Sequence, residues 1–247
     1  MKNKMKNLIT LLPVFFMASV FGQDGNDILK RVEANMSSEN RVFESTMIIH
    51  GTRSSRTITS VTYSAGEEKS FTEYLSPPRE QGTKILKLEN QLWIYSPSTD
   101  RTIQISGHML RQSVMGSDLS YEDMMDDRKL SEMYNAINTG TETVDGRKTW
   151  ILDMTAKTDN VAYYKCKMWI DTERYIPLRE ELFAKSGQML KQTNLSEVKQ
   201  IEGRWFPLKV IYKDLLKKGK GTEFIINSIK FNQPIPEYIF TKAALKK

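Results

Sequence analysis

The chain has 247 residues, of which 39% are hydrophobic and 27% are charged, and its formal net charge is +6. This length suits one large all-β domain or two small ones. Three of the positive charges are lysines within the first 22 residues, so the rest has only a mild basic excess, which argues against nucleic-acid binding. The single cysteine, Cys166, excludes an intrachain disulfide.

Residues 1–22 have the pattern of a secretory signal peptide. Lys2, Lys4 and Lys6 precede a short apolar run at 8–17, and small residues lead to Gly22. The apolar run is about ten residues long, which is too short to span a bilayer comfortably. We therefore expect export and cleavage near Gly22; the alternative is an uncleaved anchor helix.

One helix is expected directly after this segment. Asp24 or Asn26 can cap it, and Leu29, Val32 and Met36 fall on one face at helical spacing. Such an apolar stripe needs a sheet against which it can be buried.

Most of the remaining chain is predicted to be β structure. The strand-forming stretches are rich in Thr, Val, Ile, Phe and Tyr, and turn residues such as Asp145-Gly146 separate them. These stretches are 41–50, 56–63, 70–75, 83–88, 91–95, 101–105, 138–144, 148–155, 162–170, 177–184, 189–198, 205–212 and 222–231. The pattern indicates an antiparallel meander of about eleven strands in one domain, 23–247. A sheet of that width must curl, so we expect a mainly β fold: a half-open barrel with an apolar concave face.

The segment 106–133 interrupts the β pattern and is predicted to be a helical lid. Ser120 can cap a short helix, with Asp123 as its capping-box partner. The segment is rich in methionine, at positions Met109, Met115, Met124, Met125 and Met133. Flexible thioether side chains suit an adaptable apolar binding surface, although filling an ordinary core is an equally good interpretation.

The chain offers few residues for catalysis. Asp118 and Glu122 lie four residues apart and could form an acid–base pair or bind calcium, but helix capping explains the acids of 118–127 better. His50 and His108 are the only histidines, and no metal-ligand spacing, phosphate loop or nucleophile motif is present. We therefore expect neither an enzyme nor a cofactor or metal site.

Several runs resemble the outer-membrane lipoprotein-sorting proteins, which are LolA-like carriers. They are 82–86, 92–97 and 115–124, which contains a Gly-Ser-Asp-Leu-Ser-Tyr-Glu-Asp run, followed by 145–150, 167–171 and 204–207. The resemblance covers nearly all of the chain after residue 22, and the Gly-Ser-Asp run is typical of one branch of the family.

This resemblance implies a half-open β-barrel whose apolar cavity shields the acyl chains of a lipoprotein or lipid. It also implies a monomeric periplasmic carrier that takes cargo from an inner-membrane transporter and passes it to an outer-membrane acceptor. The alternative function is a lipoprotein-sensing or interaction module, or an accessory protein of a lipid exporter of the resistance-nodulation-division type that does not transport lipoproteins itself.

The expected lipid-binding residues are aromatic residues on strands and apolar residues of the lid. Trp93 and Tyr95 alternate onto one face of their strand, and we expect this pair to form a cavity wall. The full set is Trp93, Tyr95, Met109, Leu110, Met115, Leu119, Tyr121, Met124, Met125 and Trp169.

Overall fold

The computed structural model describes residues 23–126 and 128–247, so the expected signal peptide lies outside the described residues. Helix α1 (Gly25–Met36) begins where the Asp24 side chain accepts hydrogen bonds from the amides of Asn26 and Asp27. One of the two proposed caps, Asp24, is therefore the residue that starts the helix.

Thirteen strands follow in two groups. The first group is β1 (Asn40–His50), β2 (Ser55–Ala65), β3 (Lys69–Ser76), β4 (Lys84–Leu88), β5 (Gln91–Ser96) and β6 (Arg101–Ile105). The second group is β7 (Tyr134–Val144), β8 (Arg147–Ala156), β9 (Lys165–Asp171), β10 (Pro177–Phe183), β11 (Met189–Ile201), β12 (Arg204–Asp214) and β13 (Gly221–Phe231). The estimate of about eleven strands was low, and every stretch expected to be β forms one of these strands.

All thirteen strands belong to one antiparallel sheet with the order β6-β5-β4-β3-β2-β1-β13-β12-β11-β10-β9-β8-β7. Neighbours in this order are also neighbours in the chain, except that β1 pairs with β13. Strands β6 and β7 are therefore the two free edges, and the sheet does not close on itself. The predicted fold class, a mainly β half-open barrel, is confirmed.

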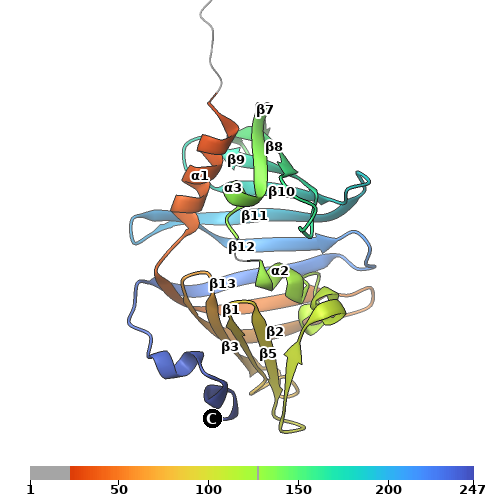
Figure 1. Ribbon diagram of the computed structural model, residues 1–247, viewed down its shortest axis with the longest axis vertical. Helices are drawn as coiled ribbons and strands as arrows, with labels where there is room; N and C mark the ends of the chain where they lie inside the picture. Colours follow the sequence, from red (N-terminus) through yellow and green to blue (C-terminus); the bar gives the residue numbers. More distant parts are fainter. Residues whose placement is uncertain (1–22, 127) are drawn as a thin grey trace, which may run out of the picture.

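The segment between β6 and β7 connects the two edges of the sheet across one of its faces. It contains η1 (Gly107–Arg111), η2 (Val114–Gly116), α2 (Tyr121–Met125) and α3 (Leu130–Met133). Figure 1 shows α2 lying over the central strands. We call this segment, 106–133, the lid, and the face of the sheet that it covers the inner face.

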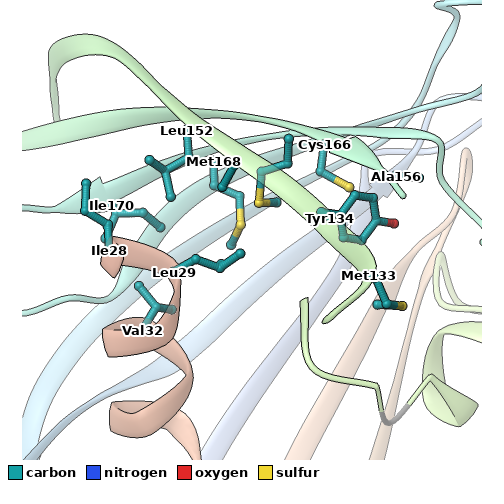
Figure 2. Close-up of a cluster of buried hydrophobic side chains, with 12 residues drawn as sticks. Ile28, Leu29, Val32, Met133, Tyr134, Leu152, Ala156, Cys166, Met168 and Ile170 are labelled. Carbon is teal, nitrogen blue, oxygen red and sulfur yellow. The ribbon is translucent and has the colours of Figure 1, made fainter. Parts of the chain in front are cut away.

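Helix α1 and α3 cover the β7–β10 end of the inner face. Ile28, Leu29 and Val32 of α1 are buried against Leu152 of β8 and Met168 of β9 (Figure 2). The expected stripe is displaced slightly, because Met36 is only partly buried at its edge and Ile28 is fully buried.

The opposite, outer face is covered at the other end of the sheet by the C-terminal segment (Figure 1). Two short helices, η3 (Glu237–Phe240) and η4 (Lys242–Lys246), place Phe240 and Leu245 against Phe71, Leu86 and Trp93. Apolar cores therefore lie on both faces of the sheet.

Replacing Leu29 by alanine tests the contribution of α1. Leu29 is fully buried, so Leu29→Ala should lower the free energy of unfolding by about 2–5 kcal/mol, measured by urea denaturation. Its exposed neighbour in the same helix, Lys30, provides the control, and Lys30→Ala should change it by no more than about 0.5 kcal/mol. Equal effects of the two substitutions would contradict this packing.

Candidate functional site: a cavity beneath the lid

A cavity of about 460 Å³ lies between the inner face and the lid. Strands β1, β2, β3, β12 and β13 contribute most of its wall, and residues 114–126 of the lid region close it. Its volume falls within the range of small-molecule sites in proteins.

One wall of the cavity is apolar. Phe43 and Met47 of β1 lie beside Phe224 and Ile226 of β13, and Val210 of β12 continues the surface. The lid covers this wall with three further apolar side chains, Val114, Leu119 and Met124.

The other wall is lined with hydroxyl groups. Ser60, Thr62 and Ser64 of β2 and Ser70 and Thr72 of β3 all face the cavity. The hydroxyls of Thr62 and Thr72 lie 2.9 Å apart, and Ser60 makes an equal contact with buried Ser45 of β1. The cavity is therefore amphiphilic, with an apolar side and a hydrogen-bonding side.

Charged side chains gather at the end of the cavity near the β2–β3 turn. Arg41, Lys69 and Lys87 line this end together with Glu67 and Asp126. The Lys87 ammonium donates a hydrogen bond to the Met124 carbonyl of the lid at 3.0 Å. The pKa of Lys87 is lowered to about 8, because burial, together with the nearby Arg41, outweighs the opposing effects of Glu67 and Asp126.

Asp118 fastens the lid to the β12–β13 hairpin. Its carboxylate accepts hydrogen bonds from the Thr222 hydroxyl at 2.7 Å and from the Asp214 amide at 2.9 Å. Its own amide donates to the Thr222 hydroxyl at 3.0 Å. Lys217 of the same hairpin also donates to the Ser117 carbonyl. The sequence suggested that Asp118 was a cap or half of an acid–base pair, whereas the carboxylate connects two distant segments.

Asp123 forms a second attachment, at α2. It completes the predicted capping box with Ser120, which is confirmed. It also pairs with Lys191 of β11 and accepts a 2.5 Å hydrogen bond from the Tyr163 hydroxyl. Burial alone would raise the pKa of Asp123, but Lys191 and the hydrogen bonds outweigh it, so the pKa lies below its ordinary value of 3.8.

The predicted lid residues pack onto the inner face beside β1–β6. Tyr121 is buried there, in contact with the cluster around Met47, Ile85 and Leu92. Met109, Leu110, Met115, Leu119, Met124 and Met125 are partly buried against the same cluster. Of these predicted residues, Leu119 and Met124 also line the cavity.

Trp93, Tyr95 and Trp169 were expected to line the cavity, but the structure places all three outside it. Trp93 and Tyr95 pack on the outer face against the C-terminal segment, while Leu92 and Ile94 face the lid. Trp169 also faces away from the α1 cluster, where its indole donates to Glu142 at 2.7 Å. Alternation placed each pair on one face correctly but could not tell which face is concave.

Sequence reasoning missed the hydroxyl wall and Arg41. A signal for the hydroxyl wall was present, because Ile58, Ser60, Thr62 and Ser64 alternate along β2 and so share one face. In the sequence analysis only the threonines were considered, as residues with high β propensity. Their position beside a cavity depends on β1 and β3, which the sequence did not place.

The described part of the chain shows no metal cluster: no three His, Cys, Asp or Glu side chains within 23–126 and 128–247 are grouped to hold an ion. His50 contacts Glu223 at 2.7 Å and Ser55 at 2.9 Å at the surface. Cys166 is buried, which raises the pKa of its thiol to about 12. Over the same described ranges, none of the helices combines the length and apolar character needed to cross a membrane.

Glu180 is an acid on the inner face with an unusual environment. Its register partners are Met168 on β9 and Thr193 on β11, and Thr193 is in turn opposite the cavity-lining Tyr212. Burial raises the pKa of Glu180 to about 7, from an ordinary value of 4.5. This carboxyl group therefore changes its charge near neutral pH.

Comparison with solved structures places this fold in a known class. It is similar to a domain from Vibrio parahaemolyticus described as an outer membrane lipoprotein-sorting protein, with a TM-score of 0.79 and 24% identity over 90% of this chain and 98% of that one. It is also similar to a DUF1329 family protein from Desulfovibrio piger, with a TM-score of 0.81 and 24% identity over 90% of this chain and 97% of that one. A LolA superfamily protein from Nitrosomonas europaea has a TM-score of 0.73 and 22% identity over 90% of this chain and 100% of that one. The chain therefore shares its fold with these three proteins, one of which is a LolA superfamily protein, and the fold that the resemblance implied is confirmed.

A family model with the description "Uncharacterized protein" matches residues 66–247, which is well over half of the chain. The chain therefore belongs to that family. A search of curated proteins found no match.

Removing the Asp118 carboxylate should loosen the lid. Asp118→Ala leaves the Thr222 hydroxyl and the Asp214 amide without this partner, at a cost of about 1–3 kcal/mol. Amide exchange across 107–125 should accelerate roughly tenfold or more, because local opening follows that free energy. The control is Asp159→Ala, which removes an exposed ion pair with Lys185 and should leave amide exchange across 107–125 unchanged. Unchanged exchange in Asp118→Ala would exclude Asp118 as an attachment of the lid.

Glu180 should make stability depend on pH. A carboxyl group whose pKa is higher in the folded state favours folding at low pH, and this contribution is lost as pH rises from about 4.5 to about 7. Between pH 5 and 8, the free energy of unfolding of Glu180→Gln should rise relative to wild type by on the order of 2 kcal/mol. Denaturant titrations of both proteins at each pH measure this difference in the free energy of unfolding. The exposed Glu44→Gln is the control, and parallel pH profiles for wild type and Glu180→Gln would refute the assignment.

Proposed function

We propose that this protein is a periplasmic carrier that binds the acyl chains of lipids or lipoproteins in the cavity beneath the lid and moves them toward the outer membrane. The observation that supports this most directly is the apolar wall formed by Phe43, Met47, Val210, Phe224 and Ile226 under an apolar lid. The proposal also takes its cargo class from the neighbour described as an outer membrane lipoprotein-sorting protein. Its partners would be an inner-membrane transporter and an outer-membrane acceptor.

The energetics of such a carrier require a balance between binding and release. Each methylene group kept from water contributes about 0.8 kcal/mol, so a cavity wall of this kind can compete for an acyl chain with a bilayer. The cargo must also leave, and the methionines of the lid can repack around chains of different shape without demanding one fit.

The attachments of the lid suit repeated opening. Asp118 and Asp123 hold it through a few hydrogen bonds and one ion pair with Lys191, each of which contributes on the order of 1 kcal/mol net. The lid also stays joined to β6 and β7 at its two ends. Opening can therefore expose the apolar wall without unfolding the sheet.

Filling the cavity should displace the cargo. Val210 is buried and lines the cavity, so Val210→Phe projects a phenyl ring into the space of about two methylenes of an acyl chain. Acyl lipid that copurifies with the protein should fall roughly tenfold, as measured by native mass spectrometry. Ile137→Phe adds a similar ring to an exposed position on β7 and should retain the wild-type amount.

Two outcomes would contradict the carrier function. One is wild-type protein that copurifies without acyl lipid and takes none up from mixed micelles. The other is equal lipid content in folded Val210→Phe and wild type. Amide exchange gives a third measurement, because bound acyl lipid should change protection across the lid.

A further inference from the structure

The tip of the β12–β13 hairpin, residues 215–220, exposes two adjacent leucines. The side chains of Leu215 and Leu216 are 43% and 68% exposed. The other large apolar side chains that the described residues expose lie singly, on β3, β6, β7 and η3. Single exposed apolar residues are ordinary on a protein surface, whereas adjacent ones at a protruding turn indicate contact with another surface.

Hydrogen bonds within the hairpin hold the leucines in these exposed positions. The Lys213 ammonium donates to the carbonyls of Lys217 and Gly219 at 2.9 and 3.0 Å. The Asp214 carboxylate accepts a hydrogen bond of 2.9 Å from the Leu216 amide. The hairpin tip is therefore a built turn, and its fold fixes the exposure of the two apolar side chains.

Lysines accompany the leucines in the same turn. Lys217, Lys218 and Lys220 follow them directly, and the side chains of Lys218 and Lys220 are exposed. The hairpin tip contains no aspartate or glutamate. Its exposed surface therefore combines apolar area with positive charge.

The β1–β2 turn, residues 51–54, extends this positive surface. It is in contact with the hairpin tip, because the Lys220 amide donates to the His50 carbonyl at 3.0 Å. The turn contributes the exposed Arg53 and has no acid of its own. The two neighbouring turns thus present cations on one side of the molecule.

The acids that border the two turns each lie beside a cation. They are Asp214 at 3.9 Å from Lys217, Glu223 at 2.6 Å from Lys209, and Glu122 in a small pocket that Arg111 and Lys191 also line. These acids are half-buried, whereas Lys218, Lys220 and Arg53 are exposed. An approaching surface therefore meets the cations first.

We propose that the hairpin tip docks on an anionic lipid bilayer, with Leu215 and Leu216 among the headgroups and the exposed lysines against lipid phosphates. Burial of apolar area and attraction of cations to anionic lipid add at a bilayer interface, and this surface offers both. The inference goes beyond the proposed carrier function, because it does not depend on what the cavity holds.

Docking at this surface brings the attachment of the lid to the bilayer. The Asp214 amide, at the base of the hairpin tip, donates to the Asp118 carboxylate of the lid. Lys217, within the tip, donates to the Ser117 carbonyl. The bonds that hold the lid closed therefore lie directly behind the surface that meets the lipid.

The test measures binding to vesicles by cosedimentation. The protein is purified from its own host, so that wild type and every variant carry the same natural N-terminus, and it is stripped of lipid in detergent. It is then mixed with vesicles of dioleoylphosphatidylcholine or of an equal mixture of that lipid with dioleoylphosphatidylglycerol. Wild type should partition roughly tenfold more strongly onto the anionic vesicles.

Two double variants separate the apolar and the charged contributions. Leu215→Ser with Leu216→Ser should lower partitioning onto anionic vesicles roughly tenfold, because less apolar area enters the interface. Lys218→Gln with Lys220→Gln should remove most of the preference for anionic lipid. All four side chains are exposed, so both variants should retain the fold.

Matched controls make the same changes elsewhere on the surface. Ile103→Ser with Ile137→Ser removes two exposed apolar side chains from the edge strands β6 and β7. Lys148→Gln with Lys199→Gln removes two exposed lysines at the opposite end of strands β8 and β11. Both controls should bind vesicles as wild type does.

Three outcomes would overturn the proposal. They are wild type that does not bind anionic vesicles, wild type that binds both kinds of vesicle equally, and hairpin variants that bind as well as their matched controls. If the hairpin tip instead crosslinks to a protein while vesicles remain unbound, the surface docks a protein and the bilayer assignment is wrong. None of these results changes the lipid content of the cavity, which tests the carrier function separately.

Discussion

The pairing of β1 with β13 is the constraint on which the rest of the structure depends. This ladder, from Arg41 opposite Phe231 to His50 opposite Gly221, joins the beginning and the end of a meander into one sheet. Because every other pairing is between neighbours in the chain, β6 and β7 are left at opposite edges. The connection between them must then cross one face of the sheet, and in this structure it crosses the inner face, where it covers the cavity.

The same pairing gives the cavity its two chemical sides. Strand β1 lies between the hydroxyl-lined β2 and the apolar β13, so the change from polar to apolar lining occurs along a single strand. It also brings Thr222, at the start of β13, within 2.7 Å of Asp118 in the lid. Cavity lining and lid attachment are therefore set by one long-range contact between residues far apart in the sequence.

The strands, α1, the lid and the Ser120–Asp123 capping box could be predicted from the sequence, because each depends on local periodicity or on residues a few positions apart. The position of Trp93, Tyr95 and Trp169 could not. Both faces of β5 are apolar, and Phe240 and Leu245, from the far end of the chain, cover one of them. The role of Asp118 was hidden for the same reason, since Asp214 and Thr222 are distant in sequence.

An unclosed sheet also has a mechanical consequence. Strands β6 and β7 share no hydrogen bonds, so the two halves of the sheet can move apart by a change in curvature without breaking any ladder. A closed barrel of fixed strand number has no such freedom, because its radius is set by strand number and stagger. The width of the cavity can thus change while the lid stays joined to both edges of the sheet.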